Sequence, residues 1–535
     1  MASSPPAWLD PLPDAAGLRA TDAWAIGTVG IPGIALMETA GALLADAVVE
    51  VAPQGPVAIV CGAGNNGGDG YVVARLLRQA GRRVRVVSTV PDERLKGDAA
   101  LARDAFGGPA DPWSAAALDD AAVIVDAILG TGASGAPRGV AAEAIAGIAA
   151  AADRGIPVVA CDVPSGVDAT TGEVAGVAVP ATATVTFHAA TSGLWIAPGK
   201  DHVGRLRIVD IGIPRRVRDL LPVPSTGLLS AAVVDALPRR RTDGTKFRSG
   251  HVLIVGGAPG MTGAPCLTAR GAMRAGAGYA TLAVPAGVES TVAARAPVET
   301  LTLALPAADD GAVAATAADV VLERLRTRRA TLVVGPGLSR GPERDRLLRA
   351  LIAGHDGALV VDADGLAALA GDPEALRART ASATRPTVIT PHAGEMARLL
   401  GVELEAVGEH RLATVRDAAR RTGAVVVLKG DDTLIAAPDG RVAISPGGAP
   451  GLATAGTGDV LAGVVGALLA RDVEPFTAAS AAVWLHLRAG LRAAEQHGVE
   501  GTVAGDVAEA VAIVRRDHDR SAAVALDRAP ARDGG

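Results

Sequence analysis

Ala455-Gly-Thr-Gly-Asp-Val460 is the stretch around which the fold of this chain can be organised. It follows a loop of glycine and proline, residues 445–451, and precedes an apolar run, residues 461–469, whose spacing predicts a buried helix. Glycines in front of a helix let backbone N–H groups converge on an anion, and the helix dipole adds partial positive charge there. The stretch therefore predicts an anion-binding turn at the start of a helix.

Asp459 suggests that this turn has a chemical role. An aspartate beside bound phosphate is unfavourable unless it acts as a base, taking a proton from a hydroxyl while the amides hold the phosphoryl group. The alternative is an ordinary glycine loop in which Asp459 caps the helix. The spacing alone does not separate these two interpretations.

The length and composition of the chain limit its class. A chain of 535 residues predicts at least two domains, each large enough for its own core. A formal charge of −6 gives no electrostatic reason to expect nucleic acid or an anionic membrane as a partner. Three widely separated cysteines, Cys61, Cys161 and Cys266, fit a reducing compartment. We see no signal-peptide pattern and no apolar run of membrane-spanning length, and we therefore expect a cytoplasmic location.

Lysine is rare in this chain. Among 51 basic residues the lysines are Lys96, Lys200, Lys246 and Lys429, so arginine supplies almost every cation. Each lysine is therefore a candidate for a function that needs a compact ammonium group. The alternative is that these four survive by chance under a coding bias.

Three predicted strands in the amino-terminal half are followed by loops rich in glycine and polar residues. They are Val57–Cys61 before Gly62-Ala-Gly-Asn-Asn-Gly-Gly-Asp-Gly70, Val123–Asp126 before Gly130-Thr-Gly-Ala-Ser-Gly135, and Pro157–Cys161 before Asp162-Val-Pro-Ser-Gly166. A strand, a glycine loop and a helix in succession are typical of a doubly wound α/β sheet. In such a parallel sheet the three strand ends should face one crevice.

At that crevice Asn66, Asp126 and Ser165 would meet as hard oxygen donors for a cation. The alternative is that Asp126 and Asp162 only cap the helices that follow them. The spacing of apolar residues also predicts helices over residues 15–50 and from Tyr71 to Gln79.

These three motifs, in this order, resemble those of the NAD(P)H-hydrate epimerase domain over about residues 15–215. The resemblance implies a Rossmann-like three-layer domain, placed at residues 1–222, that binds a hydrated nicotinamide dinucleotide and a potassium ion (K+). It implies that Asn66, Asp126 and Ser165 bind the potassium and that Asp162 is catalytic and contacts substrate. Further substrate contacts are implied for Asn65, Asn66, Gly67, Gly68, Asp69, Gly130, Thr131, Gly132, Ala133, Ser134, Gly135 and Ala136. Lys96 is a candidate for acid–base chemistry.

The proline-rich segment between Gly212 and Gly227 predicts a domain boundary. Beyond it, strands alternate with helical stretches, such as 235–241 and 264–274, which favours a largely parallel sheet. The expected strands are His251–Val255, Thr331–Val334, Ala358–Val361, Thr387–Ile389 and Ala424–Leu428. The polar tail after about residue 516 is expected to be disordered.

Glycine-rich or polar clusters follow these strands as well. They are Gly335-Pro-Gly337, Asp362-Ala-Asp-Gly365, Thr390-Pro-His-Ala-Gly-Glu395 and Lys429-Gly-Asp-Asp-Thr433. His392 is either an ordinary loop histidine or, given its unusual Pro-His-x-Gly-Glu setting, a ligand-binding residue.

Together with the Gly-Thr-Gly-Asp turn, this series resembles the ADP/ATP-dependent NAD(P)H-hydrate dehydratase domain over about residues 228–515. The resemblance implies a ribokinase-like α/β domain, placed at residues 226–535. It implies substrate contacts by Ala264, Gly337, His392 and Asp459, with Asp459 as the catalytic base. The adenine nucleotide would contact Lys429, Gly430, Asp431, Asp432, Thr433 and Gly458. Ala367 and Ala393 depart from the residues common in that family, and neither departure removes a catalytic group.

The two resemblances together imply a bifunctional repair enzyme for NADHX and NADPHX, the hydrates of NADH and NADPH. One domain would interconvert the R and S hydrates, and the other would dehydrate the S form at the expense of ADP, giving AMP and phosphate. Bacterial relatives favour ADP over ATP, with Mg2+ on the phosphates, and a homo-oligomer is expected. The alternative is a ribokinase-like small-molecule kinase fused to a dinucleotide-binding module. Release of free phosphate separates the two.

Overall fold

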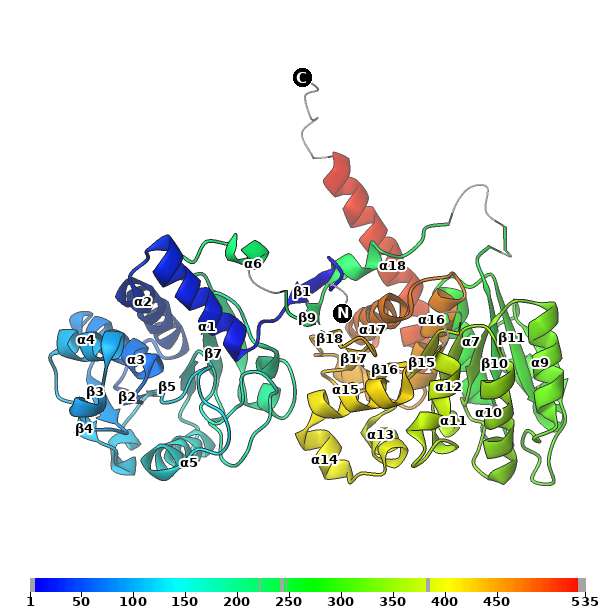
Figure 1. The fold of residues 1–535 in the computed structure, drawn as a ribbon, viewed down its shortest axis with the longest axis horizontal. Coiled ribbons are helices and arrows are strands. Elements are labelled where there is room, and N and C mark those ends of the chain that lie inside the picture. Colours follow the sequence, from blue (N-terminus) through cyan, green and yellow to red (C-terminus); the bar gives the residue numbers. More distant parts are fainter. Residues whose placement is uncertain (1–4, 221–222, 241–244, 247, 382–384, 528–535) are drawn as a thin grey trace, which may run out of the picture. The chain divides into compact units, whose positions relative to one another are not determined.

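The computed structural model describes residues 5–220, 223–240, 245–246, 248–381 and 385–527. The chain divides into two compact units (Figure 1). The first runs from Pro11 to Gly227 and includes Gly408–Arg411, and the second comprises the rest of the chain. Both are built on sheets with parallel strands, so the predicted α/β fold class is confirmed.

The first unit contains a seven-stranded parallel sheet with the order β4-β3-β2-β5-β6-β7-β8. Its strands are β2 (Val57–Cys61), β3 (Val84–Ser88), β4 (Asp111–Pro112), β5 (Val123–Ala127), β6 (Val158–Cys161), β7 (Ala183–Phe187) and β8 (Arg205–Val209). Strands β2, β5 and β6 are neighbours, so the carboxyl ends that carry the three motifs lie side by side, as the sequence predicts.

Helices cover both faces of this sheet. Ile59 belongs to a buried cluster with helices α2 (Gly33–Val51) and α3 (Asn65–Gln79). The next residue, Val60, belongs to another cluster with α5 (Gly139–Asp153). Strands that are apolar on both sides are expected where helices cover both faces of a parallel sheet. The unit therefore has the predicted three-layer, Rossmann-like architecture.

Two helix predictions in this unit need correction. The expected helix over residues 15–50 is broken: α1 (Ala15–Trp24) ends in a π-helical turn at Gly30, and α2 begins at Gly33. Gly30 has a left-handed φ of 82°, which stops a helix, and Pro32 has no N–H to continue one. Helix α3 starts at Asn65 rather than Tyr71, so the two motif asparagines form its first turn.

The second unit contains an eleven-stranded sheet with the order β1-β9-β18-β17-β16-β15-β14-β13-β10-β11-β12. From β12 to β16 the pairings are parallel, and β17 and β18 are antiparallel additions. The strands are β1 (Leu9–Pro11), β9 (Thr226–Leu229), β10 (His251–Val255), β11 (Tyr279–Pro285), β12 (Leu301–Leu305), β13 (Thr331–Val334), β14 (Leu359–Val361), β15 (Thr387–Ile389), β16 (Val425–Leu428), β17 (Leu434–Ala436) and β18 (Val442–Ile444). The strands predicted in this half are confirmed to within one residue.

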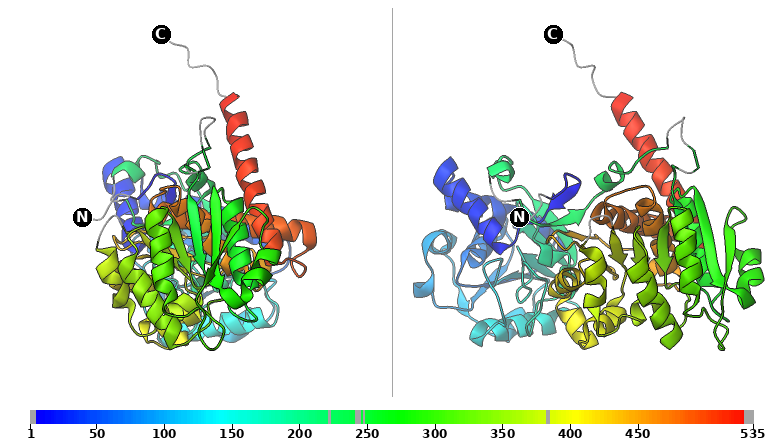
Figure 2. Two further views of the ribbon diagram at one scale, coloured as in Figure 1. Left: turned by 90° about the vertical axis from the view of Figure 1, so that its right-hand side faces the viewer. Right: turned by 45° about the vertical axis from the view of Figure 1, so that its right-hand side comes forward.

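Four helices share a buried cluster with residues of β10 such as Val252. They are α7 (Gly263–Arg274), α16 (Thr457–Leu469), α17 (Pro475–His497) and α18 (Ala504–Asp527). In the left view of Figure 2 the orange and red helices lie to one side of the green strands, and yellow-green helices lie to the other. The remaining helices are α4 (Gly97–Phe106), α6 (Val217–Leu220), α8 (Glu289–Arg295), α9 (Ala317–Thr327), α10 (Pro342–Gly354), α11 (Asp364–Ala367), α12 (Arg377–Thr380), α13 (Ala393–Leu400), α14 (Leu404–Glu409) and α15 (Arg411–Thr422).

Glycines let α7 and α16 approach within backbone contact. A Cβ atom on Gly271 would lie 2.5 Å from the carbonyl oxygen of Val460, and one on Gly463 would lie 2.0 Å from that of Thr268. A Cβ on Gly456 would meet Leu267 of α7 at 2.5 Å. The start of α16, where Asp459 lies, is therefore held against the middle of α7.

Residues 5–10 belong to the core of the second unit. Trp8 and Leu9 are buried in its main cluster, and the Trp8 ring stacks on Phe476 with centroids 5.7 Å apart. The hydroxyl of Ser230 donates a 3.0 Å hydrogen bond to the Trp8 carbonyl. Because an aromatic pair buries a large apolar surface, this short segment contributes to the stability of the second unit.

The carboxyl-terminal tail also differs from the prediction. Helix α18 continues to Asp527, so the expected disorder is wrong for residues 516–527, and residues 528–535 lie outside the described part. Arg515 pairs with Asp519 at 3.3 Å across one helical turn, and His518 Nε2 lies 2.8 Å from Asp235 Oδ1. This ion pair and this histidine–carboxylate contact belong to a helix whose composition alone resembles that of a polar tail.

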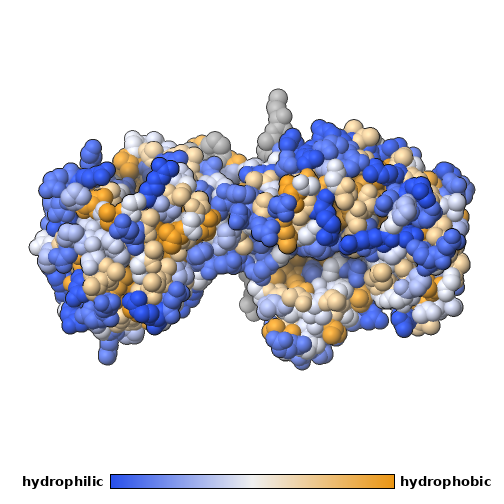
Figure 3. Space-filling view, turned by 90° about the horizontal axis from the view of Figure 1, so that it is seen from below, coloured by the Kyte–Doolittle hydropathy of each residue, from blue (hydrophilic) through white to orange (hydrophobic). Residues whose placement is uncertain are grey.

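The helix expected over residues 235–241 is wrong in the same region. A 3-10 turn, Ala231–Val234, ends just before it, and Arg241 lies outside the described part. No helix among the residues that the structure describes is long and apolar enough to span a membrane. The face seen in Figure 3 is mostly hydrophilic, with hydrophobic residues in small groups, as is usual for globular proteins.

Candidate functional site

The three glycine-containing motifs of the first unit meet around Asp162. The N–H of Thr131 donates to Asp162 Oδ2 at 3.0 Å, and the hydroxyl of Thr186 donates to Oδ1 at 3.1 Å. A Cβ atom on Gly130 would lie 3.0 Å from Asp162 Oδ2 and 3.1 Å from Asn66 Oδ1. Any side chain at position 130 would therefore fill the space between these polar groups.

Asp126 and Ser165 form a second group of oxygen atoms in this unit. The Ser165 hydroxyl and N–H donate to the two carboxylate oxygens of Asp126 at 2.6 and 2.8 Å, and the Ile128 N–H lies 3.3 Å away. Both side chains are fully buried, and burial raises the pKa of Asp126 to about 6. Asp126 lies within β5 and accepts these bonds from neighbouring loops, so the alternative in which it only caps a helix is wrong.

Several carboxyl groups gather here without cationic partners in the described part of the chain. Among the described residues, Asp69, Asp126 and Asp162 form no ion pair. Burial, and then the charge of Asp162, raise the pKa of Asp69 well above its usual range. The same two causes raise the pKa of Asp22 to about 6. A buried carboxylate must either keep its proton or gain a cation.

The other predicted residues of this unit differ in burial. Asn65, Asn66 and the following glycines form the first turn of α3, and Asp69 is buried within the same helix, 3.7 Å from Cys161 Sγ. Ser134, Gly135 and Ala136 are exposed in the loop after β5, and Lys96 is exposed at the start of α4. Their roles stay predictions.

Sequence reasoning missed Asp22 and Thr186. Asp22 lies on α1 and Thr186 lies inside β7, so neither follows a strand end directly. No local pattern marks them. Only the fold brings Thr186 to Asp162.

In the second unit, the Gly-Thr-Gly-Asp stretch forms the first turn of α16. Gly456 is the N-cap, with a left-handed φ of 91°, and Asp459 stands three residues into the helix. The interpretation of Asp459 as an N-cap is therefore wrong. A Cβ on Gly458 would lie 3.4 Å from Lys429 Nζ, which places an ammonium group beside the amides of this turn.

Lys429 is held among carboxylates. Its Nζ lies 3.0 Å from Asp362 Oδ1 and 3.7 Å from Glu395 Oε2. Burial acts to lower the pKa of Lys429, but the charges of Asp362, Glu395 and Asp459 outweigh it and raise the pKa. The ammonium is therefore a fixed positive charge at the start of α16.

Asp459 has the properties of a base. Burial and then the negative charge of Asp362 raise its pKa to about 7, although Lys429 acts in the opposite direction. A carboxylate whose pKa lies near the working pH can accept a proton efficiently. Perturbed carboxylates of this kind are typical of active sites.

His392 has a structural role at the start of α13. Its Nδ1 accepts hydrogen bonds from the N–H groups of Gly394 and Glu395 at 3.0 and 3.3 Å. Glu395 Oε2 in turn accepts from the His392 N–H at 2.9 Å, which completes a capping box. The other ring nitrogen, Nε2, lies 3.4 Å from Glu395 Oε1, and the side chain is half-exposed. A ligand-binding role for His392 stays a prediction.

A cavity of about 300 Å3 adjoins this turn and includes most of the predicted nucleotide-binding residues. It is lined by Lys429, Gly430, Asp431, Thr433 and Gly458, with apolar side chains such as Leu452 and Val483. Asp432 is 3% exposed and does not line it. Ala264 and Gly337 also lie together, since a Cβ on Gly337 would be 3.1 Å from that of Ala264.

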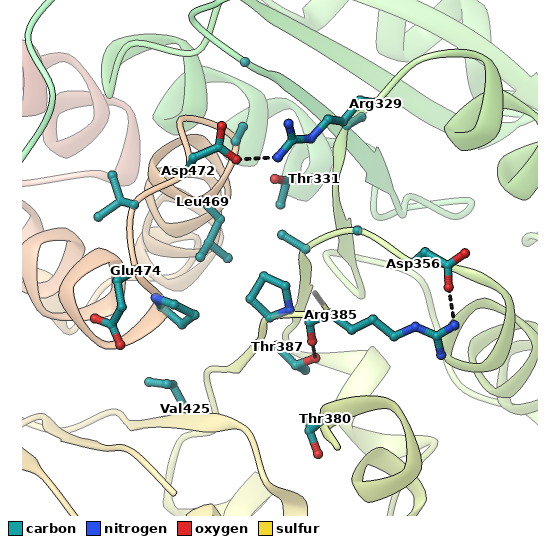
Figure 4. A pocket seen from close by; sticks show the side chains of 18 of the residues that line it. Arg329, Thr331, Asp356, Thr380, Arg385, Thr387, Val425, Leu469, Asp472 and Glu474 are labelled. Atoms are coloured by element: carbon teal, nitrogen blue, oxygen red, sulfur yellow. Dashed lines mark hydrogen bonds and ion pairs between the residues drawn. The ribbon is translucent and has the colours of Figure 1, made fainter. Parts of the chain in front are cut away.

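A larger cavity of about 1100 Å3 lies at the opposite ends of the strands, around Thr331, Thr387 and Val425 (Figure 4). Three of the four arginines that line it are already paired: Arg329 with Asp472 at 2.5 Å, Arg385 with Asp356, and Arg441 with Asp439 and Glu474. Ligands of open α/β sheets bind at the carboxyl ends of the strands. We therefore assign the chemistry to the smaller cavity.

The clusters that contain Asp362, Thr390 and Glu395 stand out in the sequence, but sequence reasoning assigned these three residues no role. Asp362 and Thr390 each follow a strand directly, and this position is the feature of the sequence that could have marked them as site residues. Their partners could not be read from it, because Lys429 lies 67 positions from Asp362 in the chain.

Comparison with known proteins covers both units. The family described as YjeF-related protein N-terminus matches residues 33–193, and the family described as NAD(P)H-hydrate dehydratase matches residues 252–512. A protein of Moorella thermoacetica named bifunctional NAD(P)H-hydrate repair enzyme Nnr is 40% identical, over 91% of this chain and 93% of its own. A protein of Salinibacter ruber with the same name is 39% identical, over 91% and 92%.

Among solved structures, the ADP/ATP-dependent NAD(P)H-hydrate dehydratase of Bacillus subtilis, co-crystallised with ATP and Mg2+, is similar to part of the chain. It is 26% identical, with a TM-score of 0.45, over 54% of this chain and 96% of its own. The full-length relatives decide the assignment, because they match both units in one chain at 39–40% identity. This chain belongs to the family of bifunctional NAD(P)H-hydrate repair enzymes.

Proposed function

We propose that the two activities of this family are divided between the two units. Residues 1–222 would carry the epimerase, which interconverts the R and S hydrates of NADH and NADPH. Residues 226–535 would carry the dehydratase, which converts the S hydrate to NADH or NADPH and ADP to AMP and phosphate. The two family matches, to residues 33–193 and 252–512, support this division.

One observation carries the proposed dehydration: Asp459, with its pKa raised to about 7, stands in the helix turn where a Cβ atom on Gly458 would lie 3.4 Å from Lys429 Nζ. In our proposal Asp459 takes the proton of the C6 hydroxyl of the hydrate. The hydroxyl oxygen then attacks the terminal phosphorus of the nucleotide, and the bond to the bridging oxygen breaks. The amides of Gly456–Gly458 and the Lys429 ammonium stabilise the charge on the transferring phosphoryl group.

The second half of the proposed reaction is an elimination. The C6–O bond breaks and phosphate leaves with the bonding electrons. Loss of a proton from the neighbouring ring carbon restores the double bond of the reduced nicotinamide. The net result is removal of water at the expense of one phosphoanhydride bond.

The charges of this site fit Mg2+ bound with the nucleotide. Three carboxylates, those of Asp362, Glu395 and Asp459, lie around the ammonium of Lys429. Among the described side chains that shift the pKa of Asp459, Lys429 is the one cation. Phosphates added to this group would need a cation. When bound, Mg2+ neutralises charge on the phosphate oxygens.

The first unit fits potassium. Asp126 is a buried carboxylate with no cationic partner in the described part of the chain, and the Ser165 hydroxyl lies against it. The side-chain amide nitrogen of Asn66 is buried without a hydrogen-bond partner among described residues, which leaves this amide free to reorient toward a ligand. Asn66, Asp126 and Ser165 would hold the cation, and its charge would offset that of the substrate phosphates.

For epimerisation we propose Asp162 as the group that exchanges a proton with the substrate. Its hydrogen bonds from Thr131 and Thr186 fix the orientation of the carboxylate. The predicted contacts of Asn65–Asp69 and Gly130–Ala136 with the dinucleotide, the homo-oligomer and the cytoplasmic location stay proposals of the sequence.

The proposed function is tested by incubating the protein with mixed hydrates, ADP and Mg2+. Recovery of the absorbance of reduced nicotinamide, together with free phosphate and AMP, is expected. The Asp459→Asn variant should lose dehydration by about 10²–10⁴, while the R and S hydrates still interconvert. A stable phosphorylated product instead of free phosphate would support the small-molecule kinase alternative and overturn the proposal.

A further inference from the structure

Asp362 lies at the centre of the charged groups around the start of α16. It follows β14 directly, and it is 1% exposed. Its Oδ1 accepts hydrogen bonds from Lys429 Nζ at 3.0 Å and from the hydroxyl of Thr390 at 2.7 Å. The proposed reaction gives Asp362 no contact with substrate, yet a buried carboxylate is costly unless it is paired.

The backbone holds Asp362 in place on both sides. Its N–H donates to the carbonyl of Val334 at 3.1 Å, and its carbonyl accepts from Gly365 at 2.9 Å. The next residue, Ala363, has a φ of 49°, a conformation that side chains other than glycine rarely adopt. Strain of this kind persists where the surrounding structure fixes a functional geometry.

Three carboxylates, Asp362, Glu395 and Asp459, lie near the Lys429 ammonium. Asp362 and Glu395 hold its ammonium at 3.0 and 3.7 Å, and no ion pair within 4.0 Å joins Lys429 to Asp459 in the part of the chain that the structure describes. A lysine in direct contact with Asp459 would stabilise its ionised form and make it a weak base. The ammonium instead lies beside Gly458, where a phosphoryl group would be held.

We propose that Asp362 is a positioning residue for dehydration: it anchors the Lys429 ammonium beside the Gly456–Gly458 turn and withholds it from Asp459. This inference rests on the proposed role of Asp459 as the base. It adds that Asp362 separates two functions, phosphoryl binding by Lys429 and proton transfer by Asp459.

The groups that face Asp459 decide the direction of the expected pH effect. They are Asp362 after β14, Asp364 of α11, Glu395 of α13 and Lys429 after β16, with His392 of α13 and His486 of α17 facing Lys429. Removing the charge of Asp362 removes a repulsion that raises the pKa of Asp459. It also frees Lys429 to pair with Asp459, and both changes lower that pKa.

The first experiment measures single-turnover dehydration by the full-length protein from pH 5 to 9, at saturating ADP and S hydrate. With Asp362→Asn, the rising limb of the rate should move to lower pH by about one unit or more, and the plateau should fall about tenfold because the base is weaker. A rising limb and plateau equal to those of the wild type would overturn the proposal. Asp372→Asn, an exposed carboxylate paired with Arg349 at 2.9 Å, is the matched control and should change neither.

A second measurement isolates the action through Lys429. Asp362→Asn should weaken ADP binding in the wild-type background but cause no further loss in a Lys429→Met background, because coupled residues are not additive. Equal losses in both backgrounds would mean that Asp362 acts only on overall structure. Thermal unfolding of the same preparations, followed by circular dichroism, reports whether the second unit of each variant is folded, and their epimerisation reports the same for the first unit.

Two further variants keep the outcomes distinct. Asp362→Glu keeps the charge but moves the ammonium, so ADP binding should weaken while the rising limb of the rate stays near that of the wild type. If Asp362→Asn does not fold, the test rests on Asp362→Glu. Unchanged ADP binding by that variant overturns the proposal. Asp459→Asn separates the two hypotheses. A near wild-type rate with Asp459→Asn removes the proposed base, whereas loss with Asp459→Asn and no change with Asp362→Asn removes only the positioning role.

Discussion

The backbone N–H of Thr131 donates a 3.0 Å hydrogen bond to Oδ2 of Asp162. This bond joins the loop after β5 to the loop after β6, and Asp162 has a φ of 66°, unusual for a residue with a side chain. The hydroxyl of Thr186 holds the other carboxylate oxygen at 3.1 Å. Both oxygens of this half-buried carboxylate therefore have a hydrogen-bond donor within the protein.

Replacement of Asp162 should separate the two activities. In Asp162→Asn the side chain keeps its size and can still accept the hydrogen bond from Thr131. Because it no longer accepts a proton, epimerisation should fall by about 10²–10⁴, while dehydration of pure S hydrate is unchanged. The measurement is the rate at which R hydrate is consumed in the presence of excess ADP.

Thr186→Val is the matched control for that experiment. It removes one hydrogen bond to Asp162, worth about 1 kcal/mol, but leaves the carboxylate. Its epimerisation should therefore fall far less than that of Asp162→Asn. Equal losses in the two variants would contradict a proton-transfer role for Asp162.

Potassium should stabilise the first unit in a pH-dependent way. The pKa of Asp126 is about 6 in the folded protein, above its usual 3.8, so ionisation of this group costs stability as pH rises through that window. A bound cation offsets that cost, and added potassium should raise the melting temperature more at pH 8 than at pH 5. Asp126→Asn should lose this response and weaken epimerisation, with dehydration nearly intact.

The control for the cation is tetramethylammonium, which supplies the charge but is too bulky for a site of oxygen ligands. In the wild type it should mimic the loss seen with Asp126→Asn. If epimerisation proceeds at the same rate in either cation and in the variant, the cation site lies elsewhere.

Dehydration by the wild type should rise with pH through about 7. The base form of Asp459 is the active one, and its pKa is raised to about 7, chiefly by burial and then by Asp362. The single-turnover rate should therefore be about half-maximal near pH 7 and fall about tenfold for each pH unit below. A rate that is flat between pH 5 and 8 would exclude Asp459 as the titrating group.

Gly458→Ala should affect phosphate binding more than stability. The new methyl group would lie 3.4 Å from Lys429 Nζ, in the cavity lined by Gly458. We expect weaker ADP binding and a rate loss of about 10²–10³, as when one donor to a developing charge is misplaced. Gly505→Ala in α18 is the control, since its Cβ would have space and its rate should not change.

Trp8→Ala should destabilise the dehydratase although Trp8 lies in the part of the sequence assigned to the epimerase, residues 1–222. The ring is 7% exposed and stacks on Phe476, so its loss should cost about 3–5 kcal/mol of unfolding free energy in the second unit. Thermal unfolding followed by loss of dehydration measures this, with epimerisation as the internal control. Trp8→Phe should recover much of the loss.

A truncated chain of residues 226–535 also tests the contact of Trp8 with Phe476, because the fragment lacks the amino-terminal segment. It lacks Trp8 and Leu9, and it should unfold at a lower temperature than the second unit of the full chain. A separate peptide of residues 5–12, added to this fragment, should bind and raise its melting temperature. Equal stability of the fragment and the full chain would show that this segment contributes little.

Local sequence was enough to predict the strands and the loops that follow them. Val57–Cys61 and Thr331–Val334 are short apolar runs that end in glycine or polar residues, and both are strands as predicted. In a parallel sheet such ends must share one edge, because every strand runs in the same direction. The motif positions at Asn66 and Asp162 therefore follow from chain order alone.

Helix ends were less predictable, because contacts distant in sequence decide them. The polar residues after Val514 form a helix, and one of them, His518, contacts Asp235, 283 positions away. The amino-terminal Trp8 gives no sign in sequence that it belongs to the core of the second unit. Neither local spacing nor composition records such partners.

The sequence by itself determined the α/β class, the two motif series and Asp459 as the candidate base. Only the tertiary structure decided what surrounds that base. Asp362, Glu395 and Lys429 come from three separate segments, and the free energy of a buried charge depends on which neighbours the fold brings within a few ångströms. That is why the pKa of Asp459 and the anchoring of Lys429 could not be read from the chain, whereas the turn that carries Asp459 could.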